Sequence, residues 1–425
     1  MKYRPRGTRD ILPGEIRLWQ FLEEKIREVS WKYGYGEIRP PIFEHTEVFT
    51  RSVGEDTDIV SKEMYTFTDP GGKHSLTLRP EGTAPVVRAY LENNLHAEPR
   101  PVKLYYYGPM FRHDRPQAGR YRQFYQYGVE CFGSYHPSSD VEVIALTMDL
   151  LEKLGLQEVR LEINSVGCKE CRPAYREKLQ DALESWEKEL CRDCRTRLHK
   201  NPLRVLDCKE DRCRELTQNA PQMVDHLCTD CREHYRGVKK LLEAQGISFN
   251  ENSRLVRGLD YYTRTAFEFI SAELGAQDSI GGGGRYDDLV EHMGGPSIPA
   301  VGVALGIERL LLSLTGTSQL EEERASFYVA VSGDEMLPEA FRVAEICRGA
   351  GSVAEVEITG RSLKAQMKYA GKKGFSHVLI IGEEEKAREE VTMRNMITGE
   401  QVEVPVTELN KEILAINVPG RKEEV

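Results

Sequence analysis

The stretch LYYYGPMFRHDRPQAGRYRQFYQYGVE, residues 104–130, is the part of the chain from which the fold can be read most directly. Both ends alternate and are rich in aromatic residues, as β-strands are, and Pro116 and Gly119 mark a turn between them. We therefore predict a β-hairpin. Its basic side chains are Arg112, His113, Arg115, Arg120 and Arg122. Arginines at such a tip offer forked hydrogen-bond donors for phosphate, and the aromatic rings offer faces for a purine. The alternative is an edge hairpin whose arginines are merely solvated.

The size and composition of the chain are those of a soluble globular protein. Its 425 residues predict two or three domains, and it is 40% hydrophobic and 30% charged. The first residues, MKYRPRGTRD, contain no apolar signal region, and no run of about 18 apolar residues follows, so we expect a cytoplasmic protein without a membrane span. The net charge of −10 does not suggest a nucleic-acid binder, but binding depends on local patches.

Eight of the ten cysteines form closely spaced pairs within one segment. The pairs are Cys168 and Cys171, Cys191 and Cys194, Cys208 and Cys213, and Cys228 and Cys231. In a reducing compartment such pairs favour metal or redox chemistry over disulfides. Four thiolates would hold one structural Zn²⁺ and eight would hold two, whereas the alternative is reduced thiols that bind nothing. The solitary Cys131 and Cys347 are predicted to be core residues.

The pattern along the chain predicts two parts. In the first, helices are expected over 15–33, after Thr83, and from a cap at Asp140 to about Gly155; strands are expected at 35–49, 75–78, 158–167, 254–271, 278–290 and 300–306. The double proline Pro40–Pro41 should interrupt one strand. The insert, about 168–240, reads as helical. After a boundary near 315–326, a β-α-β-α-β pattern predicts a small α/β domain with a parallel or mixed sheet.

No familiar nucleotide-binding loop is present. The chain has no GxxxxGK[ST] sequence, which argues against a P-loop NTPase. The run Gly281–Gly284 does not open a clear helix within a βαβ unit, which argues against a dinucleotide-binding fingerprint as well. These glycines either let the backbone approach a ligand closely or form a tight bend of a sheet.

Four other groups carry chemistry. Glu81 and Thr83 follow a predicted strand in TLRPEGT, and Glu130 ends the hairpin; carboxylates there can hold an ammonium group. RGLDYYT contains Arg257, Tyr261 and Tyr262, and GVALGIERLLL places Arg309 on an apolar helix, where burial is costly without an anion. Each of these alone is more often an ordinary ion pair.

The predicted C-terminal domain has one basic helix face. Its side chains are Arg361, Lys364, Lys368 and Lys372, and no acidic residue occurs between Ile358 and Gly382. This face is either solvated or follows a nucleic-acid backbone.

These motifs together resemble those of the bacterial histidyl-tRNA synthetase family, which belongs to the class II aminoacyl-tRNA synthetases. YGEIRPPIF with Pro41, FRHD with its loop RPQAGR, and GVALGIERLLL are similar to the three class II motifs. RGLDYYT and GGGGRYD are similar to sequences specific to the histidine enzymes. The resemblance runs from GTRDILPGE through the C-terminal domain.

The resemblance implies a fold and a reaction. The fold would be an α+β catalytic domain on an antiparallel sheet (1–320) with the helical insert, plus a small α/β anticodon-binding domain (326–425). The expected activity is histidine–tRNA ligation: L-histidine and ATP, with Mg²⁺, form histidyl-adenylate and pyrophosphate, and histidine is then transferred to the 3′-end of tRNA(His). The resemblance also implies a homodimer, with Pro41 at its interface.

Individual roles also follow from the resemblance. Arg112, Arg257 and Arg309 would be the catalytic cations, with Arg112 and Arg257 at the α-phosphate and Arg309 at the γ-phosphate of ATP. Further ATP contacts would come from Asp114, Tyr121 and Phe124. The histidine pocket would comprise Glu81, Thr83, Gln126, Glu130, Tyr261, Tyr262 and Tyr286. Contacts to tRNA would come from Arg115, Gln117, Arg361, Lys364 and Lys368.

The chain departs from the family pattern at two places. Asp114 stands where the family usually has glutamate, and its side chain is one methylene shorter. The eight insert cysteines are not part of the general pattern. The runner-up is a catalytically silent relative, a regulatory subunit of ATP phosphoribosyltransferase. Such subunits typically lack the C-terminal domain and the arginine at Arg257. A nucleic-acid-binding module without catalysis would leave the pocket residues unexplained.

Overall fold

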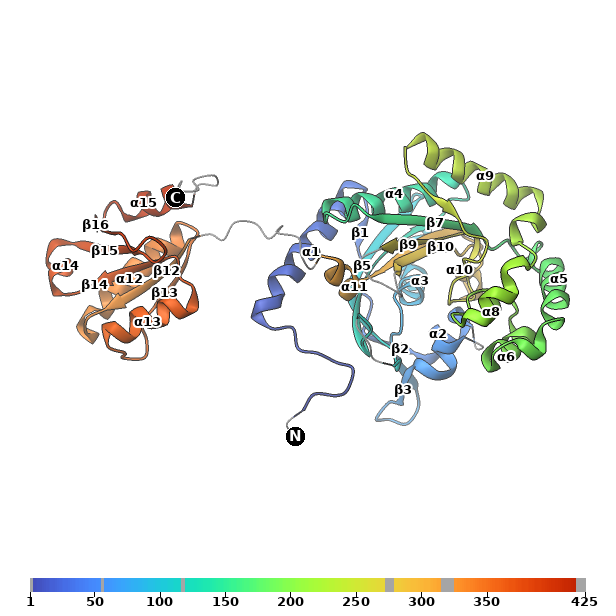
Figure 1. Cartoon of the computed structure of the whole chain (residues 1–425), viewed down its shortest axis with the longest axis horizontal. Helices are drawn as coiled ribbons and strands as arrows, with labels where there is room; N and C mark the ends of the chain where they lie inside the picture. Colours follow the sequence, from blue (N-terminus) through green and yellow to red (C-terminus); the bar gives the residue numbers. More distant parts are fainter. Residues whose placement is uncertain (1–2, 55–56, 116–118, 272–278, 315–324, 418–425) are drawn as a thin grey trace. The chain divides into compact units, whose positions relative to one another are not determined.

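The computed structural model describes residues 3–54, 57–115, 119–271, 279–314 and 325–417. The chain divides into two compact units, Met1–Gln319 and Leu320–Val425, each with its own sheet (Figure 1). Within the described residues, no helix is both long enough and apolar enough to cross a membrane.

The first unit is built on a large, mostly antiparallel sheet. Its described strands follow the order β1-β5-β6-β11-β10-β9-β7-β8, and only the outer pairs β1–β5 and β7–β8 are parallel. Their bounds are β1 Gly36–Glu37, β5 Val102–Phe111, β6 Gln123–Phe132, β7 Val159–Ser165, β8 Asn250–Glu251, β9 Thr263–Ser271, β10 Ser279–Arg285 and β11 Ala300–Gly306. This architecture confirms the predicted antiparallel α+β fold. The predicted hairpin is β5–β6, in which Tyr107 pairs with Tyr127 and Phe111 with Gln123.

Helices cover one side of this sheet. Helix α4 (Pro137–Lys153) packs against α1 (Pro13–Lys32), α9 (Thr229–Ala244) and strand β11 (Figure 1). Helix α1 forms where the sequence predicted it, because Trp19, Leu22, Ile26 and Val29 recur at helical spacing and are all buried. These helices and the strands share one hydrophobic core, which lies on the face of the sheet that the helices cover.

The remaining elements of the first unit lie around the sheet. A small antiparallel sheet has the order β2-β4-β3, with β2 Phe43–His45, β3 Tyr65–Thr68 and β4 Ser75–Leu78. Helix α2 spans Thr46–Val53, α3 Thr83–Glu92, α10 Leu289–His292 and α11 Ile307–Ser313. Strand β4, the turn at Pro80 and helix α3 occur as predicted, and so do β11 and the helix that follows it.

The cysteine-rich insert is helical, as predicted. Its helices are α5 Arg172–Glu184, α6 Arg192–Lys200, α7 Leu203–Leu206 and α8 Asp211–Leu216, and it continues into α9. A separate hydrophobic cluster that includes Tyr175, Leu179, Leu198 and Val205 holds these helices together.

The predicted cap at Asp140 is wrong. Helix α4 begins at Pro137, and the ring of His136 accepts a hydrogen bond from the backbone N–H of Ser138. Asp140 lies inside the helix, fully buried, where it pairs with Arg285 and with His234 at 3.2 Å. Arg285 also pairs with Asp287 at 3.1 Å. The acidic residue therefore compensates a buried arginine from β10 instead of capping its own helix.

The second unit is a small α/β domain with a mixed sheet, as predicted. Its strand order is β13-β12-β14-β15-β16, in which β12 is parallel to β13 and β14 and the rest is antiparallel. The bounds are β12 Ser326–Val331, α12 Leu337–Gly349, β13 Val353–Val356, α13 Leu363–Lys373, β14 His377–Ile381, α14 Glu383–Arg388, β15 Glu390–Asn395, β16 Gln401–Pro405 and α15 Leu409–Ile416. The final hairpin β15–β16 was not predicted. Cys347, like Cys131 in the first unit, is a buried core residue as expected.

Candidate functional site

A cavity of about 450 Å³ opens in the first unit, on parts of the chain that are far apart in sequence. Its walls come from the start of α3, the hairpin β5–β6, the segment 256–262, strands β9–β11 and helix α11. Twelve of the residues singled out from the sequence line it: Glu81, Thr83, Arg112, Asp114, Tyr121, Phe124, Gln126, Arg257, Tyr261, Tyr262, Tyr286 and Arg309. This is the size and character of a small-molecule site.

Glu81 lines one end of the cavity, and a second buried carboxylate, Glu130, lies behind the lining residues Thr83 and Tyr286. Glu81 accepts the backbone N–H groups of Thr83 and Ala84, both at 2.8 Å, and so caps α3. Glu130 accepts the Thr83 hydroxyl at 2.7 Å and the Tyr286 hydroxyl. Burial raises the pKa of Glu81, and it raises the pKa of Glu130 to about 8 in spite of these hydrogen bonds. A cation placed here would favour the ionised form of both groups.

Tyrosine rings surround this end. The ring centroids of Tyr261 and Tyr262 are 4.7 Å apart, and Tyr261 contacts Tyr286 edge-to-face at 5.7 Å. The carbonyl-type oxygen Oε1 of Gln126 is buried and has no hydrogen-bond partner within the described residues. Buried polar atoms are normally paired, so this oxygen is available to a ligand.

Arg112 and Phe124 form a second wall, both from the hairpin. Nε of Arg112 donates to the carbonyl of Pro80 at 2.7 Å, which ties the strand to the turn that carries Glu81. The guanidinium lies 5.4 Å from the centre of the Phe124 ring. One face of the ring is thus held by a cation, a geometry that also suits stacking on a base.

Arg257 reaches the cavity from the segment that precedes β9. Its Nη1 donates to Glu268 at 2.9 Å, and the same carboxylate oxygen accepts the Ser279 hydroxyl at 2.6 Å. Burial acts to lower the pKa of Arg257, but Glu268 outweighs it and the pKa is raised. The buried Nε of Arg257 has no partner among the described residues, so it remains available to an anion.

Arg309 enters from helix α11, which follows β11 directly. Its Nη1 donates to the carbonyl of Ser279 at the start of β10. The neighbouring Glu308 accepts the backbone N–H of Tyr125 at 3.0 Å, which fixes the helix to the hairpin. Arg112, Arg257 and Arg309 therefore line one cavity from three separate segments.

The other predicted hairpin residues either contact neighbouring charged side chains or lie away from the cavity. Asp114 pairs with Arg120 at 3.3 Å, and Tyr121 stacks under the guanidinium of Arg9 at 5.4 Å. Arg115 is exposed and does not line the cavity. Gln117 lies outside the described residues.

The run of glycines forms the middle of strand β10. A Cβ on Gly283 would lie 2.0 Å from the carbonyl oxygen of Gly302, and one on Gly302 would lie 1.8 Å from a carboxylate oxygen of Glu130. The glycines therefore permit close approach of the neighbouring backbone in β11, and Gly281, Gly282 and Gly302 also line the cavity. The close approach in the structure is to the backbone of β11, and the pairing of β10 with β9 is irregular between Ser279 and Gly281 and between Gly284 and Arg285.

Some lining residues were not predicted from the sequence. The charged ones are Asp58, Glu63, Arg204, Asp207, Lys209, Glu268 and Glu308, whereas Arg120 belongs to the predicted basic hairpin. Arg204, Asp207 and Lys209 belong to the insert, so the insert contributes to the wall of this cavity. Glu308 had a signal, because it precedes Arg309 in the third motif; the others are charged residues in unremarkable contexts.

The predicted basic face of the second unit lies on and beside helix α13. Lys364, Lys368 and Lys372 are exposed. Arg361 stacks on Tyr369 at 4.1 Å and pairs with Glu357 at 3.5 Å. The lysines are therefore the solvent-exposed part of this face, whereas Arg361 contacts Tyr369 and Glu357.

Sequence and structure comparisons identify relatives along the whole chain. A family model described as histidyl-tRNA synthetase matches residues 7–310, and one described as anticodon binding domain matches residues 326–416. The chain is 56% identical over 408 residues to a histidine–tRNA ligase of Desulforamulus reducens, which covers 96% of this chain and 97% of that protein. It is 55% identical over 422 residues to a histidine–tRNA ligase of Pelotomaculum thermopropionicum, with 99% of both chains covered.

Among solved structures, the fold is similar to that of apo histidyl-tRNA synthetase from S. aureus. That structure superposes with a TM-score of 0.81 at 38% sequence identity, and the match covers 97% of this chain and 100% of the other. The site geometry, the family models and these relatives agree, and the chain belongs to the histidyl-tRNA synthetase family.

Proposed function

We propose that this protein is a histidine–tRNA ligase that activates L-histidine with ATP and then transfers it to the 3′-end of tRNA(His). The observation that carries this proposal is the meeting of Arg112, Arg257 and Arg309 in one cavity, beside a buried pair of carboxylates. In the first step a carboxylate oxygen of histidine bonds to the α-phosphorus of ATP, and the bond to pyrophosphate breaks. Negative charge grows on the phosphoryl oxygens as this happens.

The arginines would stabilise that charge. We assign Arg112 and Arg257 to the α-phosphate and Arg309 to the γ-phosphate. Because protein contacts already hold these side chains, they act without reorganising during the reaction. Phe124 would stack on adenine, with Tyr121 and Asp114 nearby; the ion pair of Asp114 with Arg120 supports a role in ordering the tip. Mg²⁺ bound to the ATP phosphates would neutralise part of their charge.

The carboxylate end of the cavity would hold histidine. Glu81 and Glu130 match the ammonium group and an imidazole N–H, and the unpaired oxygen of Gln126 adds an acceptor. Thr83 and Tyr286 orient Glu130, while Tyr261 and Tyr262 enclose the ring. A pocket that hydrogen-bonds both imidazole nitrogens rejects apolar side chains of similar size by roughly 10⁴ or more, so an editing step is unnecessary.

The tRNA would be bound by both units. We assign the anticodon to the second unit, where Lys364 and Lys368 are exposed on α13 and Arg361 lies beside them. Arg115, exposed at the hairpin tip, and Gln117 are assigned to the acceptor end of the tRNA. The adenylate is already activated, so the 3′-hydroxyl needs no strong protein base for the second step.

We also propose that the protein is a homodimer that acts in the cytoplasm. Ile42, Phe43 and Phe67 are 46%, 52% and 44% exposed, and the rings of Phe43 and Phe67 are 6.5 Å apart. Ile42 and Phe43 directly follow Pro41 in the sequence, and Phe43 and Phe67 lie on strands β2 and β3 of the small sheet β2-β4-β3. Neighbouring exposed apolar side chains of this size favour burial against a second copy.

The test is pyrophosphate exchange. We expect labelled pyrophosphate to enter ATP only when histidine is present. Replacing Arg257 with alanine should reduce the rate by about 10²–10³, because one donor to the transition state is lost. The control is Arg236→Ala, an exposed arginine of α9 outside the cavity.

The same assay separates the alternative function. A regulatory subunit of ATP phosphoribosyltransferase would share the fold and bind histidine, yet catalyse no exchange. The match of residues 326–416 to an anticodon binding domain and the position of Arg257 in the cavity favour the ligase. Exchange with a different amino acid, or none in the unaltered protein, would exclude our proposal.

A further inference from the structure

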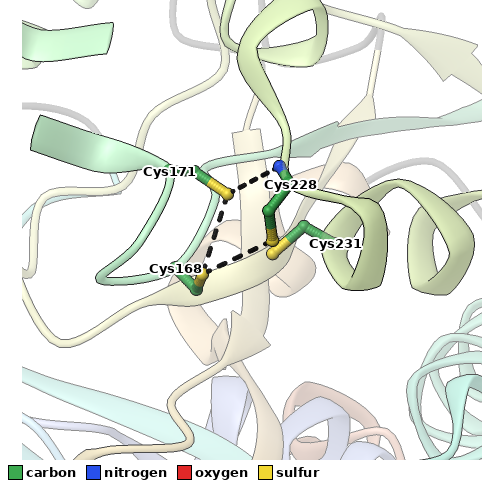
Figure 2. Close-up of side chains that lie close together, drawn as sticks. All are labelled: Cys168, Cys171, Cys228 and Cys231. Atoms are coloured by element: carbon green, nitrogen blue, oxygen red, sulfur yellow. Dashed lines mark hydrogen bonds between the residues drawn. The ribbon is translucent and has the colours of Figure 1, made fainter. Parts of the chain in front are cut away.

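The eight insert cysteines fall into two groups of four that the sequence order does not suggest. Cys168, Cys171, Cys228 and Cys231 form the first group (Figure 2), and Cys191, Cys194, Cys208 and Cys213 form the second. In each group the four Sγ atoms lie within 4.8 Å of one another. All ten cysteines of the chain are described, and none forms a disulfide. In the sequence, all four cysteines of the second group lie between Cys171 and Cys228 of the first group.

The spacing of the sulfur atoms fits a single ion better than disulfides. Cys168 Sγ lies 3.7 Å from Cys171 Sγ and 3.9 Å from Cys228 Sγ, and Cys191 Sγ lies 3.9 Å from Cys208 Sγ. A disulfide would require about 2.05 Å. A zinc ion at about 2.3 Å from each of four tetrahedral sulfurs places those sulfurs roughly 3.8 Å apart. An iron–sulfur cluster would need more space, because its inorganic atoms lie between the cysteines.

Backbone amides point at the sulfurs as well. The N–H of Cys228 donates to Cys171 Sγ at 3.1 Å and that of Glu170 to Cys168 Sγ at 3.4 Å (Figure 2 shows the first of these). In the second group, the N–H of Cys191 donates to Cys213 Sγ at 3.2 Å. Such donors stabilise the negative charge of a thiolate, the form that binds a metal.

We propose that the insert binds two Zn²⁺ ions, one in each group of four cysteines, and that these ions hold the segment 254–262 in its active position. The first claim, zinc binding, which we call the metal part, does not depend on the proposed function. The second claim, that the ions hold 254–262 in its active position, which we call the positional part, rests on the proposed function. The insert between Cys168 and Cys231 has a small core of its own, and folds of this size commonly rely on metals or disulfides for stability.

The first site connects to the cavity through Arg172, which follows Cys171 directly. Nε of Arg172 donates to the carbonyl of Val166 at 3.1 Å, and Nη2 donates to the carbonyl of Tyr262. Helix α5, which starts at Arg172, is thereby tied to the backbone of a residue that lines the cavity.

The second site connects to the other end of the same segment. Arg204 donates to the carbonyl of Arg257 at 3.0 Å. Arg254 donates to the carbonyls of Leu206 at 3.2 Å and Arg214 at 3.1 Å, which stand two residues before Cys208 and one after Cys213. The two metal sites therefore hold the segment near Arg257 and at Tyr262.

Metal analysis of the full-length protein, purified under reducing conditions, tests the metal part. We expect two zinc ions per chain and an X-ray absorption signal of four sulfurs at about 2.3 Å. Cys231→Ser and Cys194→Ser should each lower the zinc content to one ion, whereas the matched control Cys347→Ala, a buried cysteine outside both groups, should keep two. Fewer than two zinc ions in the unaltered protein, iron in their place, or disulfides found by mass spectrometry would overturn the proposal.

Hydrogen exchange tests the positional part without an activity assay. When zinc is removed with a mercurial reagent and a chelator, amide exchange should become faster in the insert and in 254–262. Peptides from 326–416 are the internal control and should not change. If the insert loses protection and 254–262 keeps it, the positional part is wrong. Because neither experiment measures ligation, their failure is distinguishable from failure of the proposed function.

Discussion

At the scale of single residues, the site depends on charges that are costly to bury alone. Glu268 compensates Arg257, and the Pro80 carbonyl satisfies Nε of Arg112. Both arginines line the cavity, where a phosphate would complete the pairing. A lysine at position 257 would lose the forked geometry, so the site is specific for arginine as well as for positive charge.

Glu130 provides a prediction about proton release. Burial raises its pKa to about 8, so at pH 7.5 much of the ligand-free protein carries a protonated Glu130. The ammonium group of a bound histidine would lower that pKa, and the proton would be released. Calorimetric titration with histidine at pH 7.5, in buffers of different ionisation enthalpy, should therefore show proton release on binding. The release should disappear above about pH 9, where the group is already ionised.

Two variants make this test specific. Glu130→Gln keeps the shape of the side chain and should remove the release while weakening binding. Glu291→Gln, an exposed residue of α10, should behave as the unaltered protein. Proton release that persists in Glu130→Gln would show that another group titrates on binding.

At the scale of elements, the glycines of β10 make the centre of the sheet compact. A Cβ at Gly283 would meet the backbone of β11, which cannot move away as a flexible side chain could. We expect Gly283→Ala to lower the free energy of unfolding by about 1–3 kcal/mol, as measured by urea denaturation. Gly14→Ala in α1, where the added methyl would contact nothing within 4 Å, should be neutral or slightly stabilising. Equal effects of both changes would argue against close packing as the reason for the glycine.

Helix α13 carries the prediction for tRNA. Lys364→Glu combined with Lys368→Glu should raise the KM for tRNA in aminoacylation and reduce its dependence on salt, because fewer counterions are released on binding. Pyrophosphate exchange should be unchanged, since α13 belongs to the second unit. Lys411→Glu on α15 is the matched control, exposed and in the same unit. A parallel loss of exchange would indicate general damage to the protein.

At the scale of the whole molecule, the exposed apolar residues beside Pro41 predict self-association. Phe43→Glu places a charge where a partner would be packed, so light scattering coupled to gel filtration should show a shift from dimer to monomer. Phe341→Glu provides a control, because Phe341 is also exposed, at 48%, but lies on α12 of the second unit. A monomeric unaltered protein, or a dimeric Phe43→Glu variant, would contradict the proposed interface.

Features that follow from local rules could be predicted from the order of the residues. The aromatic alternation of 104–130 specified a hairpin, the apolar spacing in 15–33 specified a helix, and Pro80 and Gly82 specified the turn before α3. The motifs also indicated the family, since each places a distinctive side chain at a recognisable strand end or helix start. These features depend on neighbours a few residues apart, so reading along the chain was sufficient.

Which distant side chains become partners depends on the three-dimensional fold. Asp140 has the sequence context of a cap, yet Arg285, 145 residues further along the chain, takes it as a buried counterion. Glu268 became part of the site through Arg257, and the insert supplied Arg204, Asp207 and Lys209 to its wall. The first and last of the four cysteine pairs form one group of four, and the two middle pairs form the other. Such choices follow from burial, where a charge or a thiolate must find a partner in space, and burial is a property of the folded chain alone.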